Sequence, residues 1–317
     1  MRHLMSTLFR SAAVALAIVP SLYATAAATD EPKTVSLQPA FTPGYTAKVI
    51  METTRKSTRI LKMGEAEAKP QESSTSGEQT IEFLLTVARS DDKGSAVTLR
   101  VDRIEMAAKT IRGEFAWKST DPRTTGDNTN TALSTMRPAL GSTITIEFDA
   151  EGNVTNVGNG GVQIPTGEIV DFFRLAVGPA EVRARWSPVL APRKGDFKVN
   201  LGQKWSGEEK LNTPPLGQFT ETREYVLSSI SDRLAVINFT GSYALAAGAD
   251  GQAPMFLVTD SAVTGSIHWD RTVGFFESME LNQRVELQGN ANGFPIGFRT
   301  ETSVKIRREA AAAAKPE

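Results

Sequence analysis

The sequence lacks cysteine altogether, and histidine is nearly absent, with only His3 and His268 among 317 residues. A chain without thiols forms no disulfides, has no cysteine nucleophile and offers no thiolate ligands to a metal. Metal centres usually combine several histidines, cysteines or clustered carboxylates. We therefore expect no metal and no other cofactor. The sequence also lacks a G-x-S-x-G elbow, a P-loop and a dinucleotide fingerprint.

The lack of basic clusters and the low aromatic content argue against two classes of partner. The chain has no block or stripe of basic residues, because its 35 Lys and Arg are interspersed with 36 Asp and Glu. Nothing therefore points to nucleic acid or to an anionic lipid surface as a partner. Phe, Trp and Tyr supply only 7% of the residues, which argues against a polysaccharide cleft, because such clefts rely on stacked aromatic rings.

The start of the chain has the pattern of an export signal. Basic residues up to Arg10 precede a short apolar core at 11–23, and small residues up to Ala28 offer cleavage sites. The core is shorter than the roughly 20 residues of a spanning helix, so a retained anchor is the weaker alternative. We predict that 1–28 is a cleaved signal peptide and that the protein is exported, to the periplasm or outside the cell. No membrane span is expected after cleavage.

Most of the following chain has the period of β-strands. Residues 45–61 are rich in Thr, Val and Ile, and two apolar runs flank the hairpin-turn sequence DDKG at 91–94. The polar stretch 62–79 is interpreted as a connection between strands. A further hairpin turns at EGN, 151–153. These patterns predict an N-terminal antiparallel β unit over residues 29–160.

The period changes in the middle of the chain. Apolar residues recur at helical spacing over 169–177, which predicts an α-helix ended by the Gly-Pro pair at 178–179. A shorter helical piece over 180–192 is predicted, with Pro188 among the residues that terminate it. Residues 161–194 are therefore interpreted as a helical connection between two β units.

The strand pattern resumes over 195–308 and predicts a C-terminal antiparallel β unit, followed by a disordered Ala-rich tail at 309–317. The two units resemble each other. Residues 80–108 align with 222–247, and in each unit this hairpin is followed by a strand that ends in an aromatic–Asp pair. Shared strand composition is the alternative explanation. The aligned pairs are Glu82 with Glu224, Phe83 with Tyr225, Leu85 with Leu227, Val97 with Val236 and Met106 with Leu245.

We therefore predict a mainly β (α+β) fold, built from duplicated, antiparallel, curved-sheet units with one or two helices between the halves.

The aromatic–Asp pairs allow two interpretations. Asp149 and Asp270 are either paired carboxylates for acid–base chemistry or the first residues of hairpin turns, and the flanking sequences favour turns. His268 lies in a predicted strand with no recognisable catalytic partner, which favours a structural role. The sequence thus predicts no catalytic residue, and it leaves the ligand-binding residues unknown. The scattered tryptophans are interpreted as core anchors: Trp117, Trp186, Trp205 and Trp269.

The stretches ALGSTITIEFDAEGNVTNVGN and WSPVLAPRKGDFKVNLGQKWSGEEKL resemble a family of uncharacterised exported proteins of planctomycete-type bacteria. In that family a glycine- and aspartate-containing hairpin precedes helices, and a Lys–Gly…Trp strand opens the second half. The resemblance covers about 141–307. It implies no activity, and DFKVNLGQKW departs from the compact Val-x-x-Gly-Asp-x-Trp pattern.

Three functions remain open. A curved sheet with a helix on its concave face suits a non-enzymatic binding or carrier protein of the bacterial envelope, with an apolar small molecule as partner. A structural or assembly module would instead dock an envelope protein on exposed strand edges. A hydrolase would need a carboxylate pair that sequence cannot reveal. The first is the function we predict; the partner and ligand stay unidentified.

Overall fold

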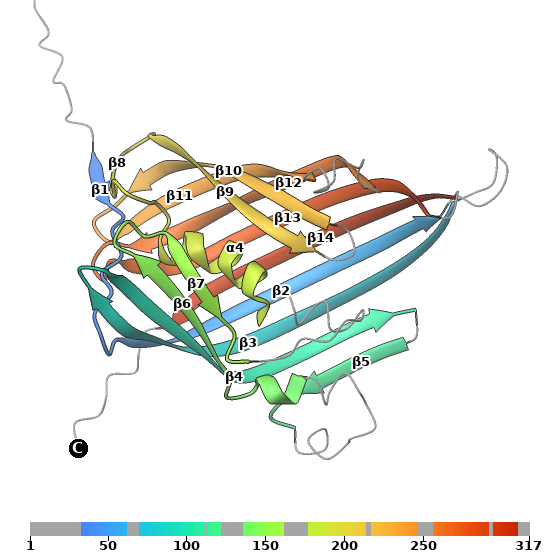
Figure 1. The fold of residues 1–317 in the computed structure, drawn as a ribbon, viewed down its shortest axis with the longest axis horizontal. Helices are drawn as coiled ribbons and strands as arrows, with labels where there is room; N and C mark the ends of the chain where they lie inside the picture. Colours follow the sequence, from blue (N-terminus) through green and yellow to red (C-terminus); the bar gives the residue numbers. More distant parts are fainter. Residues whose placement is uncertain are drawn as a thin grey trace, which may run out of the picture. The chain divides into compact units, whose positions relative to one another are not determined.

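The computed structural model describes residues 33–61, 70–111, 113–121, 136–161, 177–213, 217–245, 256–291 and 294–309. Within these residues the chain is mostly antiparallel β-structure, which confirms the predicted fold class, with one α-helix (Figure 1). The predicted signal peptide, all but the last residue of the predicted helix at 169–177, and the tail after residue 309 lie outside the described residues.

Long strands form a 12-stranded sheet with the order β7-β6-β4-β3-β2-β14-β13-β12-β11-β10-β9, and β5 pairs with one end of β4. Every neighbouring pair is antiparallel. The strands are β2 (Thr46–Leu61), β3 (Gln71–Asp91), β4 (Gly94–Thr110), β5 (Gly113–Lys118), β6 (Thr143–Asp149), β7 (Val154–Gly158), β9 (Lys204–Thr213), β10 (Gly217–Ile230), β11 (Leu234–Leu245), β12 (Phe256–Asp270), β13 (Phe275–Ala291) and β14 (Phe294–Glu309).

Three short elements accompany the sheet. β1 (Thr34–Ser36) and β8 (Lys198–Asn200) pair antiparallel as a separate two-stranded sheet. A 3-10 turn, η1 (Arg137–Ala139), buries Ala139 in the core.

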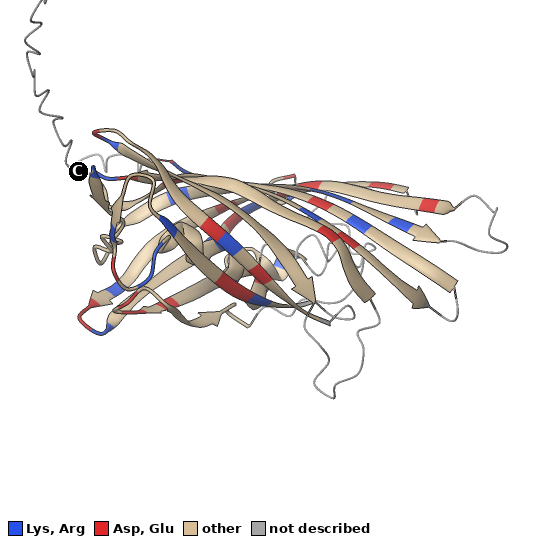
Figure 2. Ribbon diagram, turned by 90° about the horizontal axis from the view of Figure 1, so that it is seen from above, with Lys and Arg blue, Asp and Glu red and all other residues tan. Residues whose placement is uncertain are grey.

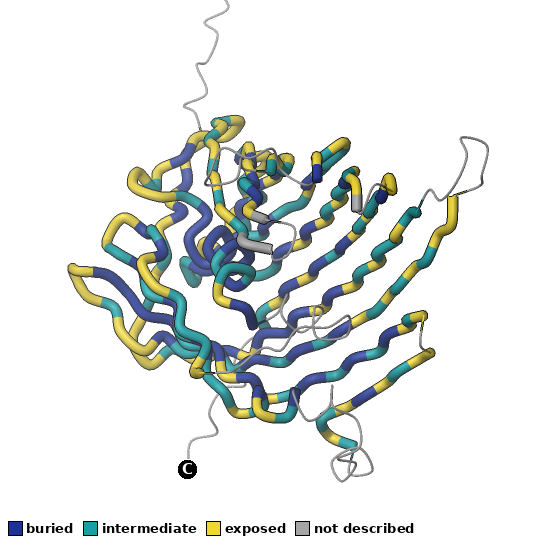
Figure 3. Tube along the Cα trace, turned by 45° about the vertical axis from the view of Figure 1, so that its right-hand side comes forward, coloured by how far each residue is buried: buried dark blue, intermediate teal, exposed yellow. Residues whose placement is uncertain are grey.

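The helix α4 (Pro179–Leu190) packs on one face of the sheet, which we call the inner face, and the opposite one the outer face. Side chains alternate between the two faces along each strand, and Figure 3 shows buried positions alternating with exposed ones. In β2, for example, Val49, Met51 and Thr53 are buried inward while Lys48 and Glu52 are exposed outward. Acidic and basic residues are interspersed on the strands, as Figure 2 shows.

α4 confirms the shorter predicted helix but corrects its end. Gly178 is the N-cap and Pro179 occupies the first turn, where its missing N–H is no loss. The prediction that Pro188 terminates the helix is wrong, because the helix continues to Leu190 and the Ala191 N–H donates to the Ser187 oxygen at 2.8 Å. A proline this close to the C-terminus removes only one bond of the last turn. Trp186 is fully buried and meets the Phe83 ring edge-on at 5.7 Å.

The hairpin predictions are confirmed at both turns, but one connection is wrong. Asp91 pairs with Gly94 across the first turn, and the Asp91 Oδ1 accepts the Lys93 N–H at 2.9 Å. The stretch 62–79 was predicted as a connection, yet β3 begins at Gln71 and pairs with β2 from Gln71 to Thr86. This part of β3 is rich in Ser and Thr, and it lies in a half-exposed region of the sheet. Because it lacks an apolar alternation, its strand structure depends on backbone hydrogen bonds to β2 and β4.

Strands from both predicted β units belong to the same sheet, since β14 pairs with β2. Each unit contributes the hairpin aligned in the sequence, β3–β4 and β10–β11, followed by a strand ending in Asp149 or Asp270. Of the aligned residues, Phe83 and Tyr225 both point inward and are buried. Val97 is buried inward, whereas Val236 alternates with the buried Ala235 and Ile237 and so points outward. Duplication of the unit stays a prediction.

Candidate binding site

The inner face carries two apolar clusters, which share the half-buried Tyr243. The larger is the core, which includes Trp186 of α4, Phe83 and Phe276. The second, which we call the distal cluster, is buried at Phe219, Phe256, Leu287 and Ile296. The Phe256 and Phe298 rings meet edge-on at 5.5 Å. Half-buried side chains extend it: Leu61, Leu211, Tyr243, Leu245, Val258, Val285 and Phe298.

The distal cluster lies along the strands beyond the core on which α4 packs. Along β13, Leu281 is the last residue of the core and Val285 the first of the distal cluster. Four residues of strand separate them, which is about 13 Å at about 3.3 Å per residue. Among the described residues, α4 packs chiefly on β7, β9 and β13, and none of its residues belongs to the distal cluster.

A buried ion pair separates the two clusters on β10. Its inward side chains run in the order Phe219, Glu221, Arg223, Tyr225, from the distal cluster to the core. Glu221 is 1% and Arg223 4% exposed, and the Arg223 Nε donates to the Glu221 Oε1 at 2.7 Å. The other polar atoms of the pair, Glu221 Oε2 and both terminal nitrogens of Arg223, make no hydrogen bond of normal geometry, although the Tyr243 side chain lies beside Glu221 and the Tyr225 side chain beside Arg223. A buried charged group with unused donors is costly unless something satisfies them.

Aromatic rings form the wall around this pair. Trp205 of β9 stacks on Tyr225 with a ring separation of 5.6 Å and an interplanar angle of 11°. The Trp205 Nε1 donates to the Pro192 oxygen at 3.0 Å, and the Arg193 guanidinium lies 5.7 Å from the indole centroid. These contacts fix the Trp205 side chain, which belongs to the edge strand β9, against the segment that follows α4.

Two glycines make room for the wall. At Gly265 an added Cβ would lie 2.4 Å from the Phe239 ring, so the ring occupies the space that a side chain would need. The Arg223 guanidinium stands 5.3 Å from the centroid of that same ring. At Gly207 an added Cβ would lie 3.2 Å from Tyr225. The close approach of these rings therefore depends on glycine.

A cavity of about 190 Å³ opens between the C-terminal end of α4 and strands β9 and β10. Glu221, Arg223 and Tyr225 of β10 line it, together with Trp205 and Arg193. The Arg193 terminal nitrogen Nη1 is buried there without a hydrogen-bond partner. The cavity thus collects three unused N–H-bearing nitrogens, two from Arg223 and one from Arg193, and one unused carboxylate oxygen.

The ionisation of this region is shaped by burial. Burial disfavours the charged form of Arg223, but the adjacent Glu221 carboxylate outweighs it and raises the pKa of Arg223. Burial is the main cause that raises the pKa of Tyr243 well above its ordinary value, and the nearby negative charge of Glu221 raises it further. On α4, burial lowers the pKa of Arg185 to about 10. Two buried guanidinium groups, Arg185 and Arg223, therefore both interact with the buried carboxylate Glu221, and Arg185 also interacts with Glu181.

The turn aspartates are structural, as the flanking sequences predict. Asp149 accepts the Asn153 backbone N–H at 2.7 Å and its side-chain amide at 2.9 Å. Asp270 accepts the Thr272 N–H at 3.0 Å and hydroxyl at 2.6 Å, and Arg308 donates to it at 3.2 Å. Burial would raise the pKa of each carboxyl, but these hydrogen bonds outweigh it and lower both pKa values. Both carboxylates are engaged in capping their own turns.

His268 and the four tryptophans were the other residues singled out in the sequence. His268 is half-buried in β12, opposite Val236 on one neighbouring strand and Ser278 on the other. Trp117, Trp186 and Trp269 are buried core anchors, as predicted. Trp205 is not: it is half-buried and lines the cavity.

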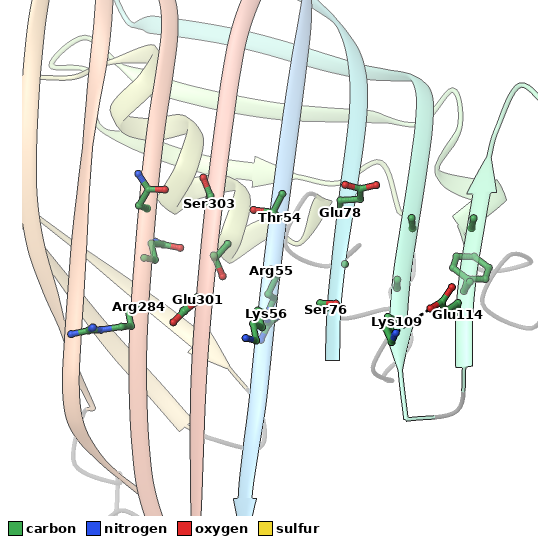
Figure 4. A pocket seen from close by; sticks show the side chains of 18 of the residues that line it. Thr54, Arg55, Lys56, Ser76, Glu78, Lys109, Glu114, Arg284, Glu301 and Ser303 are labelled. Carbon is green, nitrogen blue, oxygen red and sulfur yellow. Dashed lines mark ion pairs between the residues drawn. The ribbon is translucent and has the colours of Figure 1, made fainter. Parts of the chain in front are cut away.

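A hollow of about 1140 Å³ lies on the outer face across strands β12 to β5 (Figure 4). Its side chains are mostly exposed hydroxyl and charged groups, and Lys109 pairs with Glu114 at 3.2 Å. Lys56, Arg284 and Glu301 also line it. Such an open surface with both signs of charge is typical of a solvated sheet face, so we do not place the site there.

The two facing carboxylates at the cavity, Glu209 and Glu221, are both in salt bridges and so do not fit the acid–base pair of a glycoside hydrolase. Glu209 and Glu221 stand opposite each other on β9 and β10. Glu209 already pairs with Lys194 at 3.6 Å, and Glu221 with Arg223 at 2.7 Å. Glycoside hydrolysis requires one carboxyl as a proton donor, a role that a salt-bridged carboxylate fills poorly. Among the described residues, no cluster of three or more His, Cys, Asp or Glu is arranged to hold a metal ion.

No protein-family model matches the chain, and no curated protein matches it. Among solved structures, a lipovitellin structure titled for lipid–protein interactions has a TM-score of 0.39 at 8% identity. It covers 87% of this chain, which spans only 26% of that chain. DynF of the dynemicin pathway of Micromonospora chersina has a TM-score of 0.23 at 8% identity, covering 96% of both chains. At these values the similarities support neither a shared fold nor a shared function.

Sequence reasoning missed Glu221 and Arg223, although a pattern marks them. In GQFTETREYVL the inward positions of an alternating strand are Phe219, Glu221, Arg223, Tyr225 and Leu227. Two charges therefore occupy positions that the alternation assigns to the inner face. Such inward charges indicate a functional or paired site, because isolated charges are rarely buried.

Proposed function

We propose that the protein is an exported, non-enzymatic carrier of the bacterial cell envelope that binds an amphipathic molecule on the inner face of its sheet. The distal cluster carries this proposal. Its apolar side chains lie inward, beyond the helix that covers the core, and seven of them are only half-buried. Contiguous apolar surface of this kind is typical of ligand-binding or interaction sites.

The position of the polar groups supports an amphipathic rather than a purely apolar ligand. The cavity with Glu221 and Arg223 lies next to Phe219 of the distal cluster on the same strand. An apolar surface beside a few convergent polar groups is the usual composition of a small-molecule site. The predicted signal peptide supports the envelope location, and among the described residues no helix is long and apolar enough to span a membrane.

Docking through strand edges is less well supported. β9 ends the sheet, but its outward residues include the charged Lys204, Glu208 and Lys210. Charged side chains on an edge strand oppose the addition of another strand. The carrier is therefore the function that we put forward.

The test compares two neighbouring residues of β12 that face opposite ways. Val258 points inward into the distal cluster, whereas Leu257 points outward and is 62% exposed. The neutral fluorescent probe N-phenyl-1-naphthylamine is titrated into wild type, Val258→Glu and Leu257→Glu. We expect an inward charge to weaken probe binding about tenfold, equal to about 1.4 kcal/mol, and the outward charge to change it less than about twofold. Equal effects of the two variants, or no binding to wild type, would contradict the proposal.

A further inference from the structure

The unused hydrogen-bonding groups of the cavity specify the head group of the ligand. Three buried nitrogens, two of Arg223 and one of Arg193, have N–H groups to donate, and only one buried oxygen, on Glu221, is free to accept. A molecule that satisfies them must present more acceptors than donors. Carboxylate and phosphate groups have this composition, and the guanidinium fork of arginine matches their geometry.

The salt bridges around the cavity leave the Arg193 and Arg223 donors as the groups that a ligand can satisfy. Arg193, Lys194 and Arg223 line the cavity together with Glu208, Glu209 and Glu221, so the net charge of its lining favours neither sign. Glu209 is already paired with Lys194, and Glu221 with the Arg223 Nε. An acceptor group would satisfy the nitrogens that these pairs leave unused.

The cavity and the distal cluster are also correctly spaced for one molecule. Phe219 belongs to the distal cluster, and Arg223 lines the cavity four residues along the same strand. Four residues of strand measure about 13 Å. A ligand with its polar end at Arg223 can therefore lay its apolar part against Phe219 and the half-buried residues beyond it.

We infer that Arg223, with Arg193 beside it, binds the anionic head group, a carboxylate or a phosphate, of an amphipathic ligand whose apolar part lies on the distal cluster. This inference rests on the proposed carrier function and adds the chemical class of its ligand. Glu221 orients the guanidinium by accepting its Nε–H, and Arg223 is one of the residues that line the cavity. Its free oxygen can accept a hydrogen bond from a singly protonated phosphate.

The experiment is isothermal titration calorimetry with laurate, dodecyl phosphate and the uncharged 1-monolauroylglycerol, each below its micelle concentration. Wild type is expected to bind at least one of the two anions about tenfold more tightly than the glyceride, because hydrogen bonds to charged groups are the stronger ones. The tighter of the two anions identifies the head group. Inorganic phosphate serves as a competitor, and binding of inorganic phosphate as tight as that of dodecyl phosphate would overturn the amphipathic assignment.

Variants separate this inference from the carrier function. Arg223→Met is expected to raise the Kd of the preferred anion about tenfold and to leave that of the glyceride unchanged. Because Arg223→Met leaves Glu221 unpaired, the double variant Glu221→Gln/Arg223→Met is measured as well, and the same loss of preference is expected. Arg284→Met removes an arginine from the outer face and should change neither Kd.

The outcomes are distinguishable. If the three amphiphiles bind wild type equally, or if both Arg223 variants keep the preference for the anion, the head-group inference is overturned while the carrier function stands. If no amphiphile binds, both are overturned.

Discussion

The buried ion pair gives a sharp prediction about stability. Glu221→Gln removes the carboxylate but keeps the volume, which leaves the Arg223 guanidinium 4% exposed without the charge that its Nε contacts at 2.7 Å. Breaking a buried pair by removing one partner typically costs about 3–5 kcal/mol. Both terminal nitrogens of Arg223 already lack hydrogen-bond partners, so the main remaining favourable contact of the isolated charge is the Phe239 ring, 5.3 Å away. We expect the free energy of unfolding to fall by about that amount.

Removing both charges should be less harmful than removing one. In Glu221→Gln/Arg223→Met neither charge of the pair remains, and replacing a buried pair by groups of similar volume is often close to neutral. The assay is urea unfolding followed by circular dichroism and tryptophan fluorescence, analysed as a double-mutant cycle. The control pair is Lys109 and Glu114 on the outer face, whose side chains are 72% and 76% exposed. There Glu114→Gln should cost less than about 1 kcal/mol.

The reasoning is refuted if Glu221→Gln costs no more than Glu114→Gln. It is also refuted if the two inner-face substitutions are additive, because additivity would mean that the two charges do not interact in the folded protein.

Three further predictions concern other residues. The Cβ added by Gly265→Ala would lie 2.1 Å from the Glu280 carbonyl oxygen and 2.4 Å from the Phe239 ring, so this variant should lower stability by about 1–3 kcal/mol in urea unfolding. Gly297→Ala, with its nearest neighbour at 3.6 Å, should cost clearly less, and equal costs would contradict this. Trp205→Leu should abolish most of the fluorescence response to dodecyl phosphate, because the other described tryptophans are buried in the core, and a full response in the variant would show that the cavity is not the site. The pKa of Asp270 is lowered in the folded state, so its carboxylate stabilises the fold above its unfolded pKa of about 4, and this stabilisation is lost as the pH falls through the folded value. Asp270→Asn should therefore flatten the decline of the urea unfolding midpoint between about pH 5 and pH 3. An unchanged decline would count against the capping role of Asp270.

The sequence indicates much of this fold because local patterns decide it. The DDKG turn at 91–94 and the turn after Asp149 depend on nearby backbone and side-chain groups, so they are visible in short stretches of sequence. The strand at Gln71–Gln79 was missed because its Ser, Thr and Glu residues lack apolar alternation. Its structure depends on pairing with β2 and β4, which is information from distant parts of the chain.

The candidate site was beyond sequence reasoning for a similar reason. Glu221 and Arg223 are recognisable as inward charges once the phase of β10 is known, but their depth depends on strands β9 and β11 and on α4. Trp205 was interpreted as a core anchor because stacked and buried tryptophans look alike in a sequence. Gly265 shows its purpose only when the Phe239 ring is seen above it.

The most direct test of the central claim is native mass spectrometry of the mature protein purified from a bacterial envelope fraction, repeated after denaturing extraction. The account predicts an extra mass that leaves on denaturation and that belongs to an anionic amphipathic molecule, and it predicts that Val258→Glu carries less of it than Leu257→Glu. A bare protein mass, together with no uptake of N-phenyl-1-naphthylamine by the purified protein, would contradict the carrier function.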